Sequence, residues 1–292
     1  MATATETRSL ETPSARPRFG HASSLRVARV IWYREVLAYS RDRARLASSL
    51  VMPILMIVIF GEGFGSSIGS FQEGINYRQF IFPGVLCMTI LFGSVFSGVS
   101  IIWDREFGFL REILVAPISR TAIGMGKLLG GATIALSQGV IMFAFAPVVG
   151  VHFSPLVIVE LTAALFLFAL VMTSVGIAIA SRVKSVESFQ MITQLTIMPS
   201  MFLAGIFFPV NNLPSWMEVL VKINPVTYAV AAIRAIGLDK DLANAVAVPG
   251  AKSSVGVELF GHTMSTLESL GVLCAFGVLM FAIAIQSFRK QQ

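Results

Sequence analysis

The sequence predicts an all-α membrane protein with six transmembrane helices. Hydrophobic residues make up 55% of its 292 residues and charged residues only 13%, and the mean hydropathy is +0.78. Soluble domains, by contrast, carry about 25% charged residues. Several apolar runs reach the roughly 20 residues that a helix needs to cross a hydrocarbon core. The net charge of +6 requires no nucleic acid partner, because basic residues gather at membrane flanks.

Two segments precede the first predicted span. Residues 1–22 are rich in Thr, Ser, Pro, Ala and Arg and lack an apolar block, which predicts a disordered tail without a secretory signal. Residues 23–45 predict a basic amphipathic helix that lies along the inner membrane surface. Its predicted apolar face holds Leu25, Ala28, Trp32, Val36 and Tyr39.

The spans are predicted at about 46–64, 80–103, 122–149, 156–181, 189–209 and 267–288. Residues 23–292 therefore form a single transmembrane domain, and the even number of spans places both termini on one side. All but five of the 22 Lys and Arg residues fall on that side. Because positive charge is retained inside, both termini are predicted to be cytoplasmic.

Small and polar residues within the spans indicate helix contacts. Gly126 and Gly130 form a GxxxG spacing in the third span, which predicts the close approach of another helix. Polar side chains in the second and fifth spans either bond neighbouring helices or line a substrate path, and the pattern fits both. These residues are Ser94, Ser97, Gln190, Thr193 and Gln194.

Ionisable residues are scarce inside the spans. Glu62, Glu160, Glu268 and Lys127 fall close to predicted span ends, where long side chains reach water. A transporter driven by protons or sodium keeps such residues near the midplane. The pattern therefore favours an energy source in another subunit.

Enzymatic chemistry is poorly supported by the sequence. The region around Lys127 departs from a phosphate-binding loop, because Thr121 stands at the first glycine position and Leu128 at the Ser/Thr position. No HExxH pattern occurs. Cys87 and Cys274 lie in apolar runs and are interpreted as packing residues. We expect a non-catalytic chain with no metal and no cofactor of its own.

Residues 104–117 form a charged amphipathic segment between two apolar runs. As a helix, the segment places Phe107, Leu110 and Leu114 on one face, and Pro117 ends it. It is too polar to span the membrane and too apolar to stand free, so it belongs in a partner's groove or at the membrane surface. On amphipathicity alone, a simple interfacial anchor is the favoured interpretation.

Residues 210–237 predict a helical hairpin before the last span. Asn224 and Pro225 break it into two helices, and the charges of Glu218, Lys222 and Arg234 make it too polar to cross. We expect a re-entrant hairpin at the outer interface. Residues 239–265 are polar and rich in small side chains, which predicts an exposed loop.

Two stretches carry a family resemblance. The segments DREFGFLREILVAPISR (104–120) and FFPVNNLPSWMEVLVKINPVTYAVAAIRA (207–235) resemble the coupling helix and outer re-entrant region of type-2 ABC exporter permeases. The likeness is nearest to the daunorubicin-resistance and nodulation-factor export branch, and it covers about residues 25–289. It shifts the interpretation of residues 104–117 from an anchor to a docking element.

The resemblance implies a cytoplasmic coupling helix at 104–117 that docks with an ATPase. The residues implied for this contact are Arg105, Glu106, Phe107, Gly108, Phe109, Leu110, Arg111, Glu112, Leu114 and Pro117. A second cytoplasmic contact is implied at Arg182, Lys184 and Glu187. In the outer hairpin, the signature marks Trp216, Asn224, Pro225, Tyr228 and Arg234.

The same resemblance implies a bacterial plasma membrane permease, working as a homodimer or as a heterodimer with a related permease. Two separate P-loop ATPase subunits would bind ATP and Mg, and alternating access would export a drug, lipid, glycolipid or natural product. Multidrug efflux and antibiotic resistance fit this role. One alternative is a lipid-linked polysaccharide export permease, and another is a non-transporting membrane scaffold or immunity factor.

Overall fold

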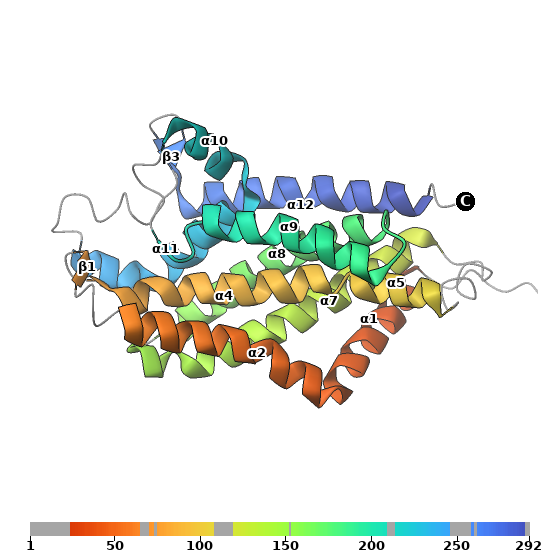
Figure 1. Cartoon of the computed structure of the whole chain (residues 1–292), viewed down its shortest axis with the longest axis horizontal. Helices are drawn as coiled ribbons and strands as arrows, with labels where there is room; N and C mark the ends of the chain where they lie inside the picture. Colours follow the sequence, from red (N-terminus) through yellow and green to blue (C-terminus); the bar gives the residue numbers. More distant parts are fainter. Residues whose placement is uncertain are drawn as a thin grey trace, which may run out of the picture.

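The computed structural model describes residues 24–64, 70–72, 75–107, 119–151, 153–208, 214–245, 258–259 and 262–289. Long helices dominate these ranges and lie side by side as one bundle (Figure 1). In chain order they are α1 (Ser24–Arg41), α2 (Arg43–Val58), α4 (Tyr77–Phe96), α5 (Val99–Glu106), α7 (Arg120–Met142), α8 (Pro155–Ala180), α9 (Val186–Leu203), α10 (Ser215–Ile223), α11 (Pro225–Ala245) and α12 (Thr266–Arg289).

Short elements extend or join these helices. A π-helical turn (Ile59–Phe64) continues α2, and two 3-10 turns (Phe143–Phe145 and Pro147–Val149) follow α7. Two small antiparallel hairpins pair β1 (Ser70–Gln72) with β2 (Ile75–Asn76), and β3 (Glu258–Leu259) with β4 (His262–Thr263). We call the end of the bundle that carries α5 the α5 end, and the opposite end, which carries α10, the α10 end (Figure 1).

Five stretches of the described residues are long and apolar enough to cross a membrane. They are Arg43–Gly61, Tyr77–Glu106, Thr121–Phe145, Pro155–Ala180 and Thr266–Gln286. These stretches correspond to the first four and the last of the predicted spans. The second is longer than predicted, because α5 carries the helix through Asp104 and Arg105 to Glu106. The first three residues assigned to the coupling helix therefore end a span.

The fifth predicted span is the exception. Helix α9 forms there, but it is not among the helices that are apolar enough to cross, since polar side chains such as Gln190 and Gln194 lower its hydropathy. The pair α10 and α11 passes the test together, as Ser215–Ile223 and Pro225–Leu238 bent by 79°. Among the described residues, a sixth candidate span is present only if this bent pair counts as one.

Local signals in the sequence explain where the helices begin. Asp42 separates α1 from α2, and its carboxylate accepts a hydrogen bond from the Arg45 amide at 3.0 Å. Ser119, Ser154 and Ser185 cap α7, α8 and α9 in the same way. Such caps satisfy amide groups that a helix leaves unpaired in its first turn. The predicted single helix over 23–45 is therefore two helices with a corner at Asp42.

The core surrounds α4, which runs through the middle of the bundle (Figure 1). On α4, Phe82, Leu86 and Ile90 are fully buried, and Leu165 and Phe168 of α8 belong to the same apolar cluster. Only 22% of the apolar stretch of α2, and the same share of that of α12, is buried, so both helices lie at the outside of the bundle. This is the pattern of a membrane protein in which outer helices present apolar side chains to lipid.

Helix α1 packs directly on the glycines of α7. A Cβ atom at Gly126 would lie 2.7 Å from the Ile31 Cβ, and one at Gly130 would lie 2.8 Å from the Glu35 Cβ. The predicted close approach at this GxxxG spacing is confirmed, and its partner is α1. The predicted apolar face of α1 is only partly right, because Ala28 and Tyr39 are buried but Leu25 is 82% exposed.

Several sequence predictions lie outside the described residues. These are the tail 1–22, most of the coupling helix (108–117), the start of the outer hairpin (210–213) and about half of the predicted outer loop (246–257 and 260–261). Within the described part of that loop, the prediction of irregular structure is wrong at its start. Helix α11 continues to Ala245 instead of ending near residue 237.

Candidate functional site

Four charged side chains form one ionic group at the α5 end. The Arg34 guanidinium contacts the Asp104 carboxylate at 2.9 Å, and the Lys127 ammonium contacts the Glu35 carboxylate at 2.7 Å. Lys127 is also paired with Asp104, and it donates a hydrogen bond to the Ser100 hydroxyl at 3.0 Å. We call Arg34, Glu35, Asp104 and Lys127 the charge cluster. It ties α1, α5 and α7 together.

Three of the four side chains in the charge cluster are shielded from solvent, and the cluster is balanced in charge. The Lys127 side chain is only 4% exposed, and those of Glu35 and Asp104 are 14% exposed. Two cations face two carboxylates, so each buried charge has a partner, as low-dielectric surroundings require. Burial alone would raise the pKa of Glu35, but the charge and hydrogen bond of Lys127, aided by Arg34, hold it below its ordinary value.

Arg105 connects the end of α5 to the end of α8. Its guanidinium donates a hydrogen bond to the Ala180 carbonyl at 2.8 Å, and α5 also packs against α9. The turn at residues 181–185 joins α8 to α9. The start of the predicted coupling segment and the predicted second contact therefore lie side by side at the α5 end.

The exposed residues at this end are those that a partner could reach. Glu106 and Phe107 are exposed, the latter at 83%, and the side chains of Arg182, Lys184 and Glu187 are exposed on the neighbouring turn and first turn of α9. The other predicted coupling residues lie outside the described part of the chain. They are Gly108, Phe109, Leu110, Arg111, Glu112, Leu114 and Pro117.

The outer hairpin residues act mainly as internal braces at the α10 end. The Asn224 side chain donates to the Ser200 carbonyl at 2.7 Å and accepts from the Val226 amide at 3.2 Å. These bonds hold the bend at Pro225, where α11 begins. The Tyr228 hydroxyl donates to the Lys222 carbonyl at 2.6 Å.

Arg234 connects α11 to α4 and to the segment that follows α9. Its guanidinium lies 3.8 Å from the centre of the Phe80 ring and donates to the Gly205 carbonyl at 2.9 Å. A cation held over an aromatic face in dry surroundings is a stabilising contact. Trp216 does not join this group, because its side chain is 66% exposed on α10.

Comparison with known proteins decides the family. The model of the ABC-2 type transporter family matches residues 26–238. The chain belongs to this family. It is 30% identical over 212 residues to ycf38 of Cyanophora paradoxa, which is named as a transport permease, covering 70% of this chain and 72% of the relative.

Two bacterial relatives of this ABC-2 chain carry more specific names. The inner membrane transport permease YadH of Escherichia coli K12 is 27% identical over 211 residues, or 70% of this chain and 80% of YadH. DrrC of Mycobacterium tuberculosis, named as a doxorubicin resistance ABC transporter permease, is 25% identical over 236 residues, or 77% and 83%. The chain is therefore a multi-pass ABC-2 transport permease.

The residues predicted to line a path in this ABC-2 permease differ in their exposure. Ser94 and Thr193 are fully buried, and neither hydroxyl has a hydrogen-bond partner among the described residues. Ser97 donates to the Ser94 carbonyl of its own helix at 2.6 Å. Gln190 and Gln194, in contrast, are exposed on α9.

Sequence reasoning missed the charge cluster of this ABC-2 permease. Lys127 was predicted to reach water from a span end, and that is wrong, because the side chain is buried and paired with Glu35. The usable signal was the match between a cation inside a span and the adjacent Arg34 and Glu35 on the preceding amphipathic helix. Glu35 supplies a carboxylate for Lys127 only when α1 lies on α7, and Asp104 then makes the group neutral.

Proposed function

We propose that this ABC-2 permease is the membrane subunit of an ATP-driven exporter, and that its α5 end receives the ATPase. The observation that supports this is the hydrogen bond from Arg105 to Ala180, because it joins the two predicted contact regions into one surface. The charge cluster fixes the same end of α5 to α1 and α7. A push on residues 104–107 would therefore be transmitted to three other helices.

The proposal includes the arrangement in the cell. Two P-loop ATPase subunits, which bind ATP and Mg, dock on two permease chains in the bacterial inner membrane, with both termini of each permease in the cytoplasm. The distribution of Lys and Arg supports this orientation. The two bundles then alternate between inward and outward access, and the permease chains are identical or closely related.

The cargo we propose is a hydrophobic or amphipathic molecule such as a drug, lipid, glycolipid or natural product. The name of DrrC, a doxorubicin resistance permease, supports a cargo of this kind. The scarcity of ionisable residues near the midplane of the spans fits a neutral or amphipathic solute better than coupled ion transport.

Helix α9 supports the pairing of two permease chains. Its exposed side combines Met191, Leu195 and Phe202 with Gln190 and Gln194. Two exposed amides are costly against lipid tails, where nothing satisfies their hydrogen bonds. We therefore place a second permease copy, or the path between two copies, on this side of the bundle.

The decisive experiment is a pull-down of the tagged permease from mildly solubilised native membrane, with identification of the co-purifying chains. We expect a P-loop ATPase in equal amount, and we expect Glu106→Lys to reduce its recovery and to uncouple ATP hydrolysis from efflux. The matched control is Glu160→Lys, because Glu160 is an exposed carboxylate in the first turns of α8, at the opposite end of the bundle from Ala180.

Recovery of the permease alone from several mild detergents would contradict the proposal. Equal losses in Glu106→Lys and Glu160→Lys would also contradict the placement of the ATPase at the α5 end. If the ATPase binds but no dye or lipid is exported from reconstituted vesicles, a non-transporting scaffold or immunity factor becomes the better interpretation.

A further inference from the structure

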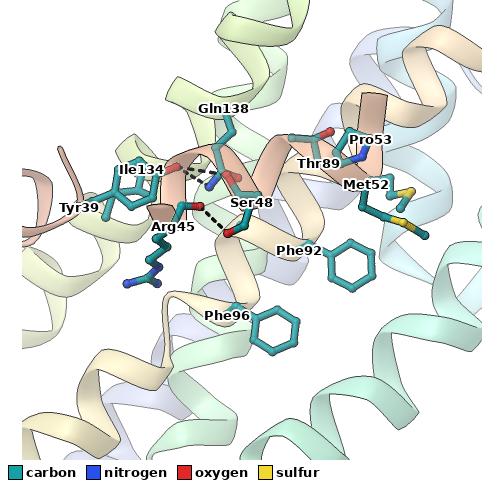
Figure 2. Close-up of a pocket in the computed structure, with 13 residues that line it drawn as sticks. Tyr39, Arg45, Ser48, Met52, Pro53, Thr89, Phe92, Phe96, Ile134 and Gln138 are labelled. Carbon is teal, nitrogen blue, oxygen red and sulfur yellow. Dashed lines mark hydrogen bonds between the residues drawn. The ribbon is translucent and has the colours of Figure 1, made fainter. Parts of the chain in front are cut away.

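A pocket of about 320 Å³ lies between α1, α2, α4 and α7, apart from the charge cluster and from the outer hairpin (Figure 2). Its apolar wall consists of Met52, Pro53, Met88, Phe92, Phe96 and Ile134. The rings of Phe92 and Phe96 are stacked 6.1 Å apart at 12° to each other, which makes one side of the pocket flat and apolar. Its volume is at the lower end of the range of about 300–1,000 Å³ typical of small-molecule sites.

The uncharged polar side chains that line the pocket already have hydrogen-bond partners within the protein. The Gln138 amide donates to the Tyr39 hydroxyl at 2.8 Å, and the Ser49 hydroxyl lies 3.5 Å from the same oxygen (Figure 2). The Ser48 hydroxyl donates to the Arg45 carbonyl at 3.1 Å. These groups therefore need no polar ligand, and a bound molecule would meet mainly apolar surface here.

Arg45 differs from these groups because none of the carboxylates in the described residues neutralises its charge. Its guanidinium lies 5.8 Å from the Tyr39 ring and 5.9 Å from the Trp103 ring. Within the described part of the chain, no carboxylate is paired with it. Asp42 is near in sequence, but its side chain accepts from the Arg45 backbone amide.

The position of Arg45 at one end of a candidate span indicates the chemical class of the ligand. It lies in the first turn of α2, the helix whose apolar stretch Arg43–Gly61 is long enough to span. An exposed arginine beside tyrosine and tryptophan rings is typical of headgroup depth. Farther along α2, the pocket is open at Ser48 and Met52, which are exposed on the outside of the bundle.

We propose that this pocket holds an anionic phospholipid of the bilayer. The Arg45 guanidinium binds the phosphate, and one acyl chain lies against Met52, Phe92 and Phe96. The lipid fills the corner between α1 and α2, and it is a resident ligand rather than cargo, so the site goes beyond the proposed function.

The test is native mass spectrometry of the full-length permease, purified in mild detergent, stripped of lipid and titrated with dioleoyl phosphatidylglycerol. We expect Arg45→Gln to weaken binding at least tenfold. Arg43→Gln removes the same charge two residues away, from an exposed side chain outside the pocket, and we expect less than a twofold change. Ser48→Phe fills the mouth of the pocket, and we expect it to abolish binding without lowering the lipid-free unfolding temperature.

Two further probes separate the headgroup from the chain. Dioleoyl phosphatidylcholine, which has the same chains and no net charge, should bind at least tenfold more weakly, and sn-glycerol 3-phosphate should not bind in the same concentration range. Equal binding of the two phospholipids, equal effects of Arg43→Gln and Arg45→Gln, or full binding to Ser48→Phe would each overturn the proposal.

Discussion

Arg105 and Ala180 are separated by 75 residues, yet the Arg105 guanidinium donates a hydrogen bond to the Ala180 carbonyl at 2.8 Å. This bond joins the last turn of α5 to the last residue of α8. A cation at a helix C-terminus meets unpaired carbonyl groups and the negative end of the helix dipole. The contact therefore stabilises the end of α8 while it fixes the position of α5.

Arg105→Gln should lower the free energy of unfolding by about 1.5–3 kcal/mol, the usual value of a hydrogen bond to a charged group. Thermal unfolding in detergent measures the effect. Arg26→Gln is the control, because it removes the same charge from an exposed position on α1. Equal unfolding temperatures for the two variants would show that the bond to Ala180 contributes nothing.

Lys127→Met should be more damaging, because it leaves Glu35 and Asp104 buried with only Arg34 between them. Breaking a buried pair costs about 3–5 kcal/mol. Adding Glu35→Gln removes the orphaned carboxylate and should restore part of the loss. A double-mutant cycle on unfolding free energies checks this, and strictly additive losses would contradict the pairing.

Acid should lower the stability of the fold by protonating Glu35. Its pKa in the folded protein lies below the ordinary value of 4.5, so its charge stabilises the fold above the unfolded pKa. That stabilisation is lost as the pH falls through the folded pKa. Unfolding temperatures between pH 7 and pH 3 should therefore fall more steeply below about pH 4.5 in the wild type than in Glu35→Gln. Parallel curves for the two proteins would count against this role.

Gly126→Ala should displace α1 from α7, because the new Cβ would lie 2.7 Å from the Ile31 Cβ and 2.8 Å from the Ala28 carbonyl oxygen. Overpacking of this kind costs about 1–3 kcal/mol. Gly124→Ala in the same helix meets nothing within 4 Å and should be neutral or stabilising by up to about 1 kcal/mol. A comparison of their unfolding temperatures decides the point; similar losses in both variants would mean that α1 does not rest on Gly126.

The spans were predictable where a single property determined them. Helices α8 and α12 begin and end within a few residues of their predicted bounds, because unbroken apolar runs leave no other place for them. At α9, hydropathy alone was insufficient to predict a span. Whether a helix with Gln190 and Gln194 on its exposed side can lie in the membrane depends on what covers that side. The length of α11 was predicted wrongly because the polar residues from 239 onward were interpreted as a loop.

The candidate site was predictable only in its parts. The GxxxG spacing of Gly126 and Gly130 predicted that another helix packs closely on α7. It did not predict which helix, because that depends on the shape and the charges of α1. Pairing Lys127 with Glu35 requires knowing that two segments 92 residues apart lie together. Local patterns carry no such information. The family resemblance likewise assigned Arg105 to an ATPase contact, which stays a prediction, and did not give its bond to Ala180.

The charge cluster also imposes an order on biosynthesis. During synthesis, Arg34 and Glu35 emerge first with α1. Asp104 follows at the end of α5, and Lys127 comes last, within α7. Until Lys127 arrives, the nascent chain holds two carboxylates and one of the two cations that neutralise them. Helix α1 can therefore pack in its final position only after α7, the third span, has been inserted. Insertion of α7 thus completes the amino-terminal part of the protein.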